Sequence, residues 1–129
     1  RPPRSTLIRS RRQRQMCIRD SYDRLAHFSV GFYAYPVAEV LMRKRLVRTR
    51  WIVSLFPIFA IVTVAGIYEI IEWQYAISAN PQAGVAVLGS QGDIWDAQKD
   101  ILADTLGAIT AMLLFFSQHR TELATLRDG

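Results

Sequence analysis

Residues 89–107 read Gly-Ser-Gln-Gly-Asp-Ile-Trp-Asp-Ala-Gln-Lys-Asp-Ile-Leu-Ala-Asp-Thr-Leu-Gly, and the remainder of the chain is best interpreted from this stretch. After a glycine-containing turn it places four aspartates at spacings of three, four and four residues: Asp93, Asp96, Asp100 and Asp104. This spacing lines one face of an α-helix with 3.6 residues per turn. The same helix continues into the apolar run 109–116. Because acids on a lipid-compatible helix are costly, the pattern indicates a functional site.

The composition of the 129-residue chain shows strong segregation of charge. Half of the residues are hydrophobic, and the net charge of +5 comes from basic blocks. Seven arginines fall in positions 1–19, and five Lys or Arg residues fall in positions 43–50. No nucleic-acid recognition motif accompanies them, and basic blocks beside apolar runs are typical of membrane topology. The single cysteine, Cys17, excludes an internal disulfide and an all-cysteine metal site.

Three segments have the length and apolar character of membrane spans, at about residues 22–42, 51–77 and 93–117. The second is the clearest, and Pro36 is expected to kink the first. No useful length of the chain alternates like a strand. The sequence therefore predicts an all-α, multi-pass transmembrane helical bundle over 22–117, followed by a cytoplasmic tail over 118–129.

Residues 1–21 differ from the rest, because they lack a hydrophobic period and a helix cap. The run Arg-Gln-Met-Cys-Ile-Arg-Asp-Ser at 14–21 resembles translated adapter sequence at the broken ends of assembled genes. With no initial Met, this favours a non-native arm on a C-terminal piece of a longer protein. A disordered basic arm at a membrane surface is the alternative. A signal peptide is excluded, since no cleavable apolar region follows the basic residues.

The positive-inside rule places the basic loop 43–50 in the cytoplasm. The first helix then starts outside, the second ends outside, the third re-enters from outside, and the C-terminus is cytoplasmic. One consequence is that acids and a histidine from all three helices share the outer half of the membrane. Asp104 then lies about 16 Å below Asp93, within the hydrocarbon layer. Because independent surface charges would not need a common depth, we expect one site there.

Two pairs at helical spacing are candidates for the opposing walls of this site. Asp23 and His27 are four residues apart, so the carboxylate can orient an imidazole that acts as acid or base. The alternative is an acid at a helix start beside an interfacial histidine. Glu69 and Glu72 are three residues apart and suit a divalent cation or proton transfer. Their alternative is an interfacial rim of exposed acids.

An oxygen-rich cluster of this kind favours Mg²⁺, Mn²⁺ or Ca²⁺. Like charges on one helix face repel, so the aspartates require a cation, protonation or partners such as Lys99, Arg24 or His27. We predict the following set of cation ligands: Glu69, Glu72, Asp96 and Asp100. In this hypothesis His27 is the acid or base and Asp23 orients it. The supporting residues are Asp93, which can also cap the helix, together with Asp104, Arg24 and Lys99.

Three segments carry a resemblance to a known family. They are Tyr-Asp-Arg-Leu-Ala-His-Phe at 22–28, Gly-Ile-Tyr-Glu-Ile-Ile-Glu-Trp at 66–73 and Gly-Ser-Gln-Gly-Asp-Ile-Trp-Asp-Ala-Gln-Lys-Asp at 89–100. They resemble the YjdF-like family of bacterial inner-membrane proteins of unknown function. Members of that family are longer and have additional N-terminal membrane helices. The resemblance therefore implies an inner-membrane location, lipid and those helices as partners, and an unassigned biochemistry.

A weaker resemblance connects the chain to VanZ-type membrane proteins, which carry an Asp-Lys-x-x-His-Phe segment and a Glu-x-x-Gln segment. Here Arg24 replaces the Lys and Glu72 replaces the Gln, while Asp104 stands where an Asn is common. VanZ is linked to tolerance of glycopeptide antibiotics. The three departures argue against extending that role to this chain.

Two functional hypotheses follow for this membrane protein. The first is a divalent-cation-dependent enzyme of cell-envelope or lipid chemistry, with its site facing outwards. The second is a non-enzymatic protein that uses the same acids for cation or proton passage, or to lock its helices together. Passage requires a polar path to the cytoplasmic side, and the run 109–116 has no ionisable residue. The sequence therefore favours the enzyme.

Overall fold

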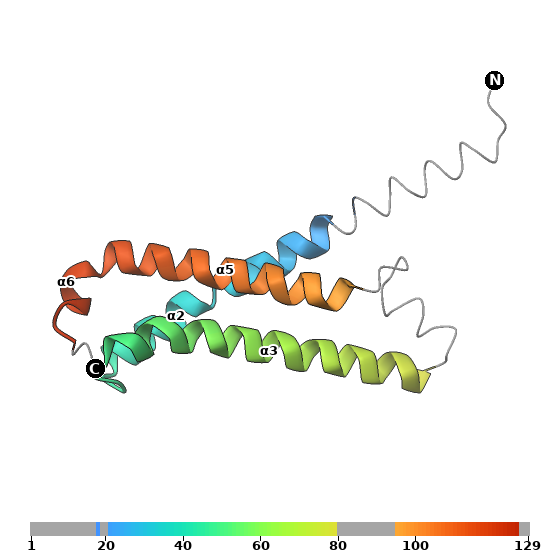
Figure 1. The fold of residues 1–129 in the computed structure, drawn as a ribbon, viewed down its shortest axis with the longest axis horizontal. Coiled ribbons are helices and arrows are strands. Elements are labelled where there is room, and N and C mark those ends of the chain that lie inside the picture. The colour runs from blue at the N-terminus through green and yellow to red at the C-terminus, as the bar shows by residue number, and fades with distance from the viewer. Residues whose placement is uncertain (1–17, 19–20, 80–94, 127–129) are drawn as a thin grey trace, which may run out of the picture.

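The computed structural model describes residue 18 and residues 21–79 and 95–126, and the elements in these ranges are helices (Figure 1). A helix over 21–31 is followed by α2 (Ala34–Arg43), α3 (Arg50–Ala79), α5 (Asp96–Gln118) and the short α6 (Arg120–Leu123). No β-strand occurs among the described residues. The all-α prediction is confirmed.

Two of these helices are long and apolar enough to cross a membrane. With 30 and 23 residues, α3 and α5 extend over about 45 Å and 35 Å at a rise of about 1.5 Å per residue. Both lengths exceed a hydrocarbon core of about 30 Å. The expected segments 51–77 and 93–117 correspond to α3 and α5, although residues 93 and 94 lie outside the described part.

The structure divides the expected helix over 22–42 into two helices that meet at a turn over Phe32 and Tyr33. Pro36 accounts for the turn, because proline has no N–H to donate to the carbonyl of Phe32. That carbonyl instead accepts the N–H of Tyr35 at 3.0 Å, in a tighter turn. The N–H of Phe32 likewise donates to Ser29 at 3.1 Å. The kink expected at Pro36 therefore takes the form of a break one turn earlier.

The segment 21–43 runs parallel to α5, and α3 connects them in the opposite direction (Figure 1). The contacts between segment 21–43 and α5 occur in the same order along both segments, from Arg24 with Asp100 to Tyr35 with Gln118. The core between α2, α3 and α5 is made mainly of small side chains around a few large ones. Its buried members include Ala34, Ala38, Val53, Ala108, Ala111, Met112 and Phe115.

Two glycines allow the 21–31 helix and α5 to touch through their backbones. A β-carbon on Gly31 would overlap the carbonyl oxygen of Asp104 and lie 2.5 Å from the amide nitrogen of Ala108. A β-carbon on Gly107 would overlap the carbonyl oxygen of Phe28 and lie 3.1 Å from the Cα of Gly31. Small residues are the usual means of such close approach between membrane helices. This Gly31–Gly107 crossing lies one helical turn beyond the acidic face.

Candidate functional site

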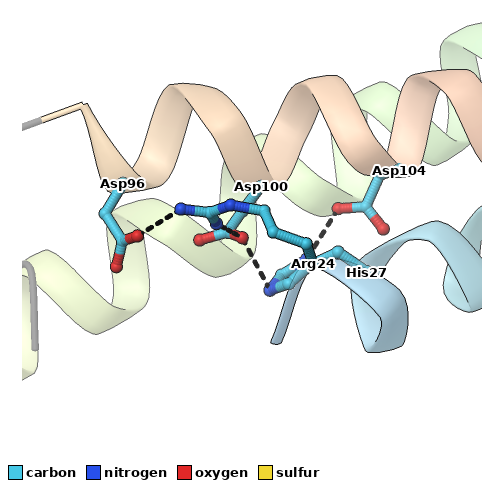
Figure 2. Close-up of polar contacts among 5 residues, drawn as sticks. All are labelled: Arg24, His27, Asp96, Asp100 and Asp104. Carbon is cyan, nitrogen blue, oxygen red and sulfur yellow. Dashed lines mark hydrogen bonds and ion pairs between the residues drawn. The ribbon is translucent and has the colours of Figure 1, made fainter. Parts of the chain in front are cut away.

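The acidic face of α5 meets the basic and imidazole side chains of the 21–31 helix (Figure 2). Arg24 forms ion pairs with both Asp96 and Asp100, which lie one turn apart on α5. The side chain of Asp100 is only 6 % exposed, so its charge requires a partner. Arg24 is that partner: it donates one charge-assisted hydrogen bond to Asp100 and a second to Asp96, and such bonds are stronger than neutral ones.

His27 lies between Asp100 and Asp104, with one ring nitrogen toward each (Figure 2). Its Nδ1 is 2.9 Å from Oδ2 of Asp104. When Asp104 is ionised its carboxylate only accepts hydrogen bonds, so in that state the Nδ1–H of His27 is the donor. Its Nε2 is 3.7 Å from Oδ1 of Asp100. In the neutral ring the Nε2 then carries the lone pair, and this is the nitrogen available to a proton or a cation.

Asp23, His27 and Asp100 form a group whose ligand atoms all lie within 4.8 Å of one another. Two carboxylates and one imidazole can hold a metal ion after small side-chain movements. Asp23 is exposed, His27 is partly buried and Asp100 is buried, so the group extends from the surface into the bundle.

Asp104 is the most deeply buried acid of the site, with its side chain 2 % exposed. One of its oxygens accepts from His27, while Oδ1 has no hydrogen-bond partner among the described residues. A buried oxygen without a partner carries a desolvation cost of about 1–3 kcal/mol. Such a cost is expected at a functional position more often than in an ordinary core.

The third wall of the site comes from α3. The ring of Tyr68 lies edge-on to His27, with 6.5 Å between the ring centres. Glu72 lies one helical turn after Tyr68 on α3. Glu69 is close enough to Glu72, His27, Asp96 and Asp104 for electrostatic interaction with each. Together with one guanidinium and one imidazole, these residues include six carboxylates, so the group as a whole is acidic: Asp23, Glu69, Glu72, Asp96, Asp100 and Asp104.

The structure brings several of the residues singled out from the sequence into one place: Asp23, Arg24, His27, Asp96, Asp100 and Asp104. Of the four predicted cation ligands, Glu69, Glu72, Asp96 and Asp100, only Asp100 belongs to the group whose ligand atoms lie within 4.8 Å of one another among the described residues. Lys99 is exposed on α5 and has an interaction of its own. Asp93 lies outside the described residues. The sequence named Arg24 and His27 among the basic partners of the aspartates and Asp23 as the residue that orients the imidazole, but it did not single out the pair of His27 with Asp104. No local signal could have found it, because 77 residues separate the two side chains.

Comparison with known proteins agrees with this fold. The chain matches over residues 12–121 the family described as "Predicted membrane protein (DUF2238)". It is 37 % identical over 106 residues to the inner membrane protein YjdF of Escherichia coli (strain K12), which covers 81 % of this chain and 50 % of that protein. No solved structure matches.

The fold and the family match define a helical membrane protein. The chain belongs to the DUF2238 family of predicted membrane proteins, the YjdF-like proteins. The resemblance found in the sequence is thereby confirmed. The chain spans about half the length of the curated relative that it matches. The family match begins within the arginine-rich segment 1–21.

Proposed function

We propose that this protein is a divalent-cation-dependent enzyme of cell-envelope or lipid chemistry, whose cation is held by Asp23, His27 and Asp100. One observation carries the proposal: both ring nitrogens of His27 face carboxylates, Nδ1 at 2.9 Å from Asp104 and Nε2 at 3.7 Å from Asp100. A metal-ligating histidine characteristically donates its second N–H to a carboxylate, which fixes the ring and raises its basicity. Asp104 supplies that carboxylate.

The donor set narrows the choice of cation. Carboxylates suit Mg²⁺, Ca²⁺ and Mn²⁺, while an imidazole suits Zn²⁺ and other transition metals. A mixed set of two carboxylates and one imidazole therefore favours Mn²⁺ within the range expected from the sequence. Asp100 can serve both Arg24 and the cation, because a carboxylate has about four lone-pair positions. Glu69, Glu72 and Asp96 then add negative charge around the ion.

The chemistry follows from the position of the site on the helices. A cation at this place would polarise a phosphoryl or carbonyl oxygen, or activate a water molecule. We place the loop 43–50 and the C-terminus in the cytoplasm, so that the site lies in the outer half of the membrane. Lipid headgroups and envelope precursors meet the protein at this level. The apolar end of α5, Ile109–Phe116, favours such chemistry over passage of ions through the bundle.

Cation-dependent stability tests this proposal. We expect Mn²⁺ to raise the midpoint of thermal unfolding of the purified protein by several degrees, since a ligand at 100 times its Kd stabilises by about 2.7 kcal/mol. Asp23→Asn and Asp100→Asn should abolish the shift. Glu39→Gln is the matched control, because Glu39 pairs with Arg43 at 2.6 Å, away from the site. Equal behaviour of all the variants, or no shift with Mn²⁺, Mg²⁺, Ca²⁺ or Zn²⁺, would contradict the proposal.

A second candidate is a structural role in which the charges lock the helices together. The ion pairs of Arg24 with Asp96 and Asp100 favour it, because they satisfy two acids within the protein. Arg24→Met separates the two roles. If the site binds a cation, the variant should be destabilised without Mn²⁺ and largely restored by it, because Asp96 and Asp100 lose their guanidinium. If Arg24 is only a structural lock, Mn²⁺ should restore nothing.

A further inference from the structure

A groove between α3 and α5 lies at the opposite end of the bundle from the acidic site. Its volume is about 600 Å³, within the range of about 300–1,000 Å³ typical of small-molecule sites. Most of its wall is apolar and includes Trp51, Leu55, Ile58, Met112 and Leu113. The exposed fractions of Trp51 and Leu113 are 63 % and 64 %. The described part of the chain thus leaves this α3–α5 groove accessible from the side.

Positive charge lies at one end of the groove. Arg50, the first residue of α3, lines both the groove and a smaller hollow next to it. Phe116 is also shared, and Arg120 lines the smaller hollow together with Leu123. Glu122, the acid of α6, lines neither of them. Arg50 also has an interaction of its own. Among the described residues, the lining of the combined space is therefore apolar along its length and has two arginines at its end.

The depth of these residues fits a lipid. Trp51 follows Arg50 directly, and tryptophan is typical of the boundary between hydrocarbon and headgroups. From Trp51 to Ile58 the wall of the groove continues for about 10 Å along α3. The groove thus begins at headgroup level and descends along the path of an acyl chain. Basic pockets between membrane helices are known recognition sites for anionic headgroups.

We propose that the α3–α5 groove binds an anionic phospholipid, with an acyl chain against Trp51, Leu55 and Leu113 and the phosphate beside Arg50 and Arg120. Charge complementarity selects this occupant. A zwitterionic lipid would fill the same apolar wall, but its positive choline group would lie near the same two arginines. The binding is independent of the cation site, because the residues of the groove and those of the site do not overlap.

Quenching of Trp51 fluorescence by lipids brominated in the acyl chain tests the proposal. The chain carries Trp73→Phe and Trp95→Phe, so that Trp51 alone reports, and is reconstituted with brominated phosphatidylglycerol or phosphatidylcholine. Each arginine near a membrane surface is worth about fivefold in binding. We therefore expect phosphatidylglycerol to bind at least about fivefold more tightly, with a preference that weakens as salt is raised.

Arginine variants show which side chains produce the preference for phosphatidylglycerol. Arg50→Gln combined with Arg120→Gln should bring the preference close to one. Arg48→Gln removes the same charge from the same basic segment, outside the groove, and should leave it unchanged. Equal quenching by the two lipids in the parent chain would overturn the proposal. Absence of quenching by either lipid would also overturn it, by showing that another part of the protein covers the groove. Both results are obtained with the single-tryptophan chain alone, without the arginine variants.

Discussion

At the scale of single residues, Asp104 and His27 hold each other in place. The carboxylate is 2 % exposed and the imidazole 18 %, so neither is well solvated on its own. Their 2.9 Å contact directs Nδ1 of the ring toward Asp104. It therefore determines that Nε2 faces Asp100, where the proposed cation chemistry takes place. Asp104 acts as a positioning residue in this scheme.

Replacing Asp104 by leucine should lower the free energy of unfolding by about 1–3 kcal/mol, because the Nδ1–H of His27 loses its acceptor inside the bundle. Asp104→Asn retains an oxygen acceptor and should cost less. The measurement is denaturant unfolding of the purified protein in detergent. Equal stability of the two variants would show that the contact between His27 and Asp104 contributes little.

The sequence identifies these residues better than it pairs them. Asp100 and Asp104 are conspicuous as acids on a lipid-compatible helix, and spacing alone places them on one face. Their partners Arg24 and His27 lie 76 and 77 residues earlier. Local spacing connects His27 with Asp23 because only neighbours four residues apart are visible in a helical sequence. The contact with Asp104 arises from how two distant helices align, and that alignment leaves no local trace.

At the scale of helices, the Gly31–Gly107 crossing sets how closely the 21–31 helix approaches α5. A β-carbon at either glycine would meet backbone atoms, which cannot move aside as a flexible side chain can. The crossing lies three residues after Asp104 on α5 and four residues after His27 on the other helix. Separating the helices there would therefore also separate the residues of the site.

Alanine substitutions test this crossing against a matched glycine. Gly31→Ala and Gly107→Ala should each destabilise the protein by about 1–3 kcal/mol, as overpacking does, and weaken any cation response. At Gly66 of α3 a β-carbon would meet nothing within 4 Å. Gly66→Ala should therefore be neutral, or stabilising by up to about 1 kcal/mol through helix propensity. The measurement is the midpoint of thermal unfolding of the three variants. An unchanged midpoint for Gly31→Ala would contradict the close contact between the two helix backbones.

Helix prediction succeeds where one signal dominates. The long uncharged run that begins at Trp51 predicts α3. The aspartate spacing, followed by an apolar run, predicts α5. In the first segment two signals compete, since hydrophobic length favours one helix and Pro36 prevents its backbone hydrogen bonding. Pro36 indicates that the helix is interrupted, but the turn itself lies at Phe32 and Tyr33. There the carbonyl of Phe32, which lacks a donor at Pro36, accepts the N–H of Tyr35 instead.

At the scale of the whole molecule, the described bundle exposes many large apolar side chains. Along α3 these include Leu55, Phe56, Phe59, Val64, Ile67, Ile70 and Ile71, each at least 42 % exposed. Soluble proteins rarely present apolar surface of this extent, and lipid or further helices would cover it in a membrane protein. The curated relative is about twice as long as the part matched, so further chain is present in that protein.

Cysteine labelling in intact cells tests the proposed orientation. In a Cys17→Ser background, Ser90→Cys should react with a membrane-impermeant maleimide from outside. Arg48→Cys should react only after the cells are opened, because the basic loop is expected to be cytoplasmic. The reverse pattern would place the acidic site on the cytoplasmic side and exclude an outward-facing enzyme.

The parallel alignment of the 21–31 helix with α5 has a consequence for biosynthesis. Parallel neighbours require a return helix between them, so Arg24 and His27 precede their acidic partners by 72–77 residues. At a synthesis rate of about 5–20 residues per second, Arg24 and His27 leave the ribosome about 4–15 s before their acidic partners on α5. During that interval Arg24 depends on water or lipid phosphate for its charge. Insertion of α5 therefore completes the site and joins the first described helix to the last long one.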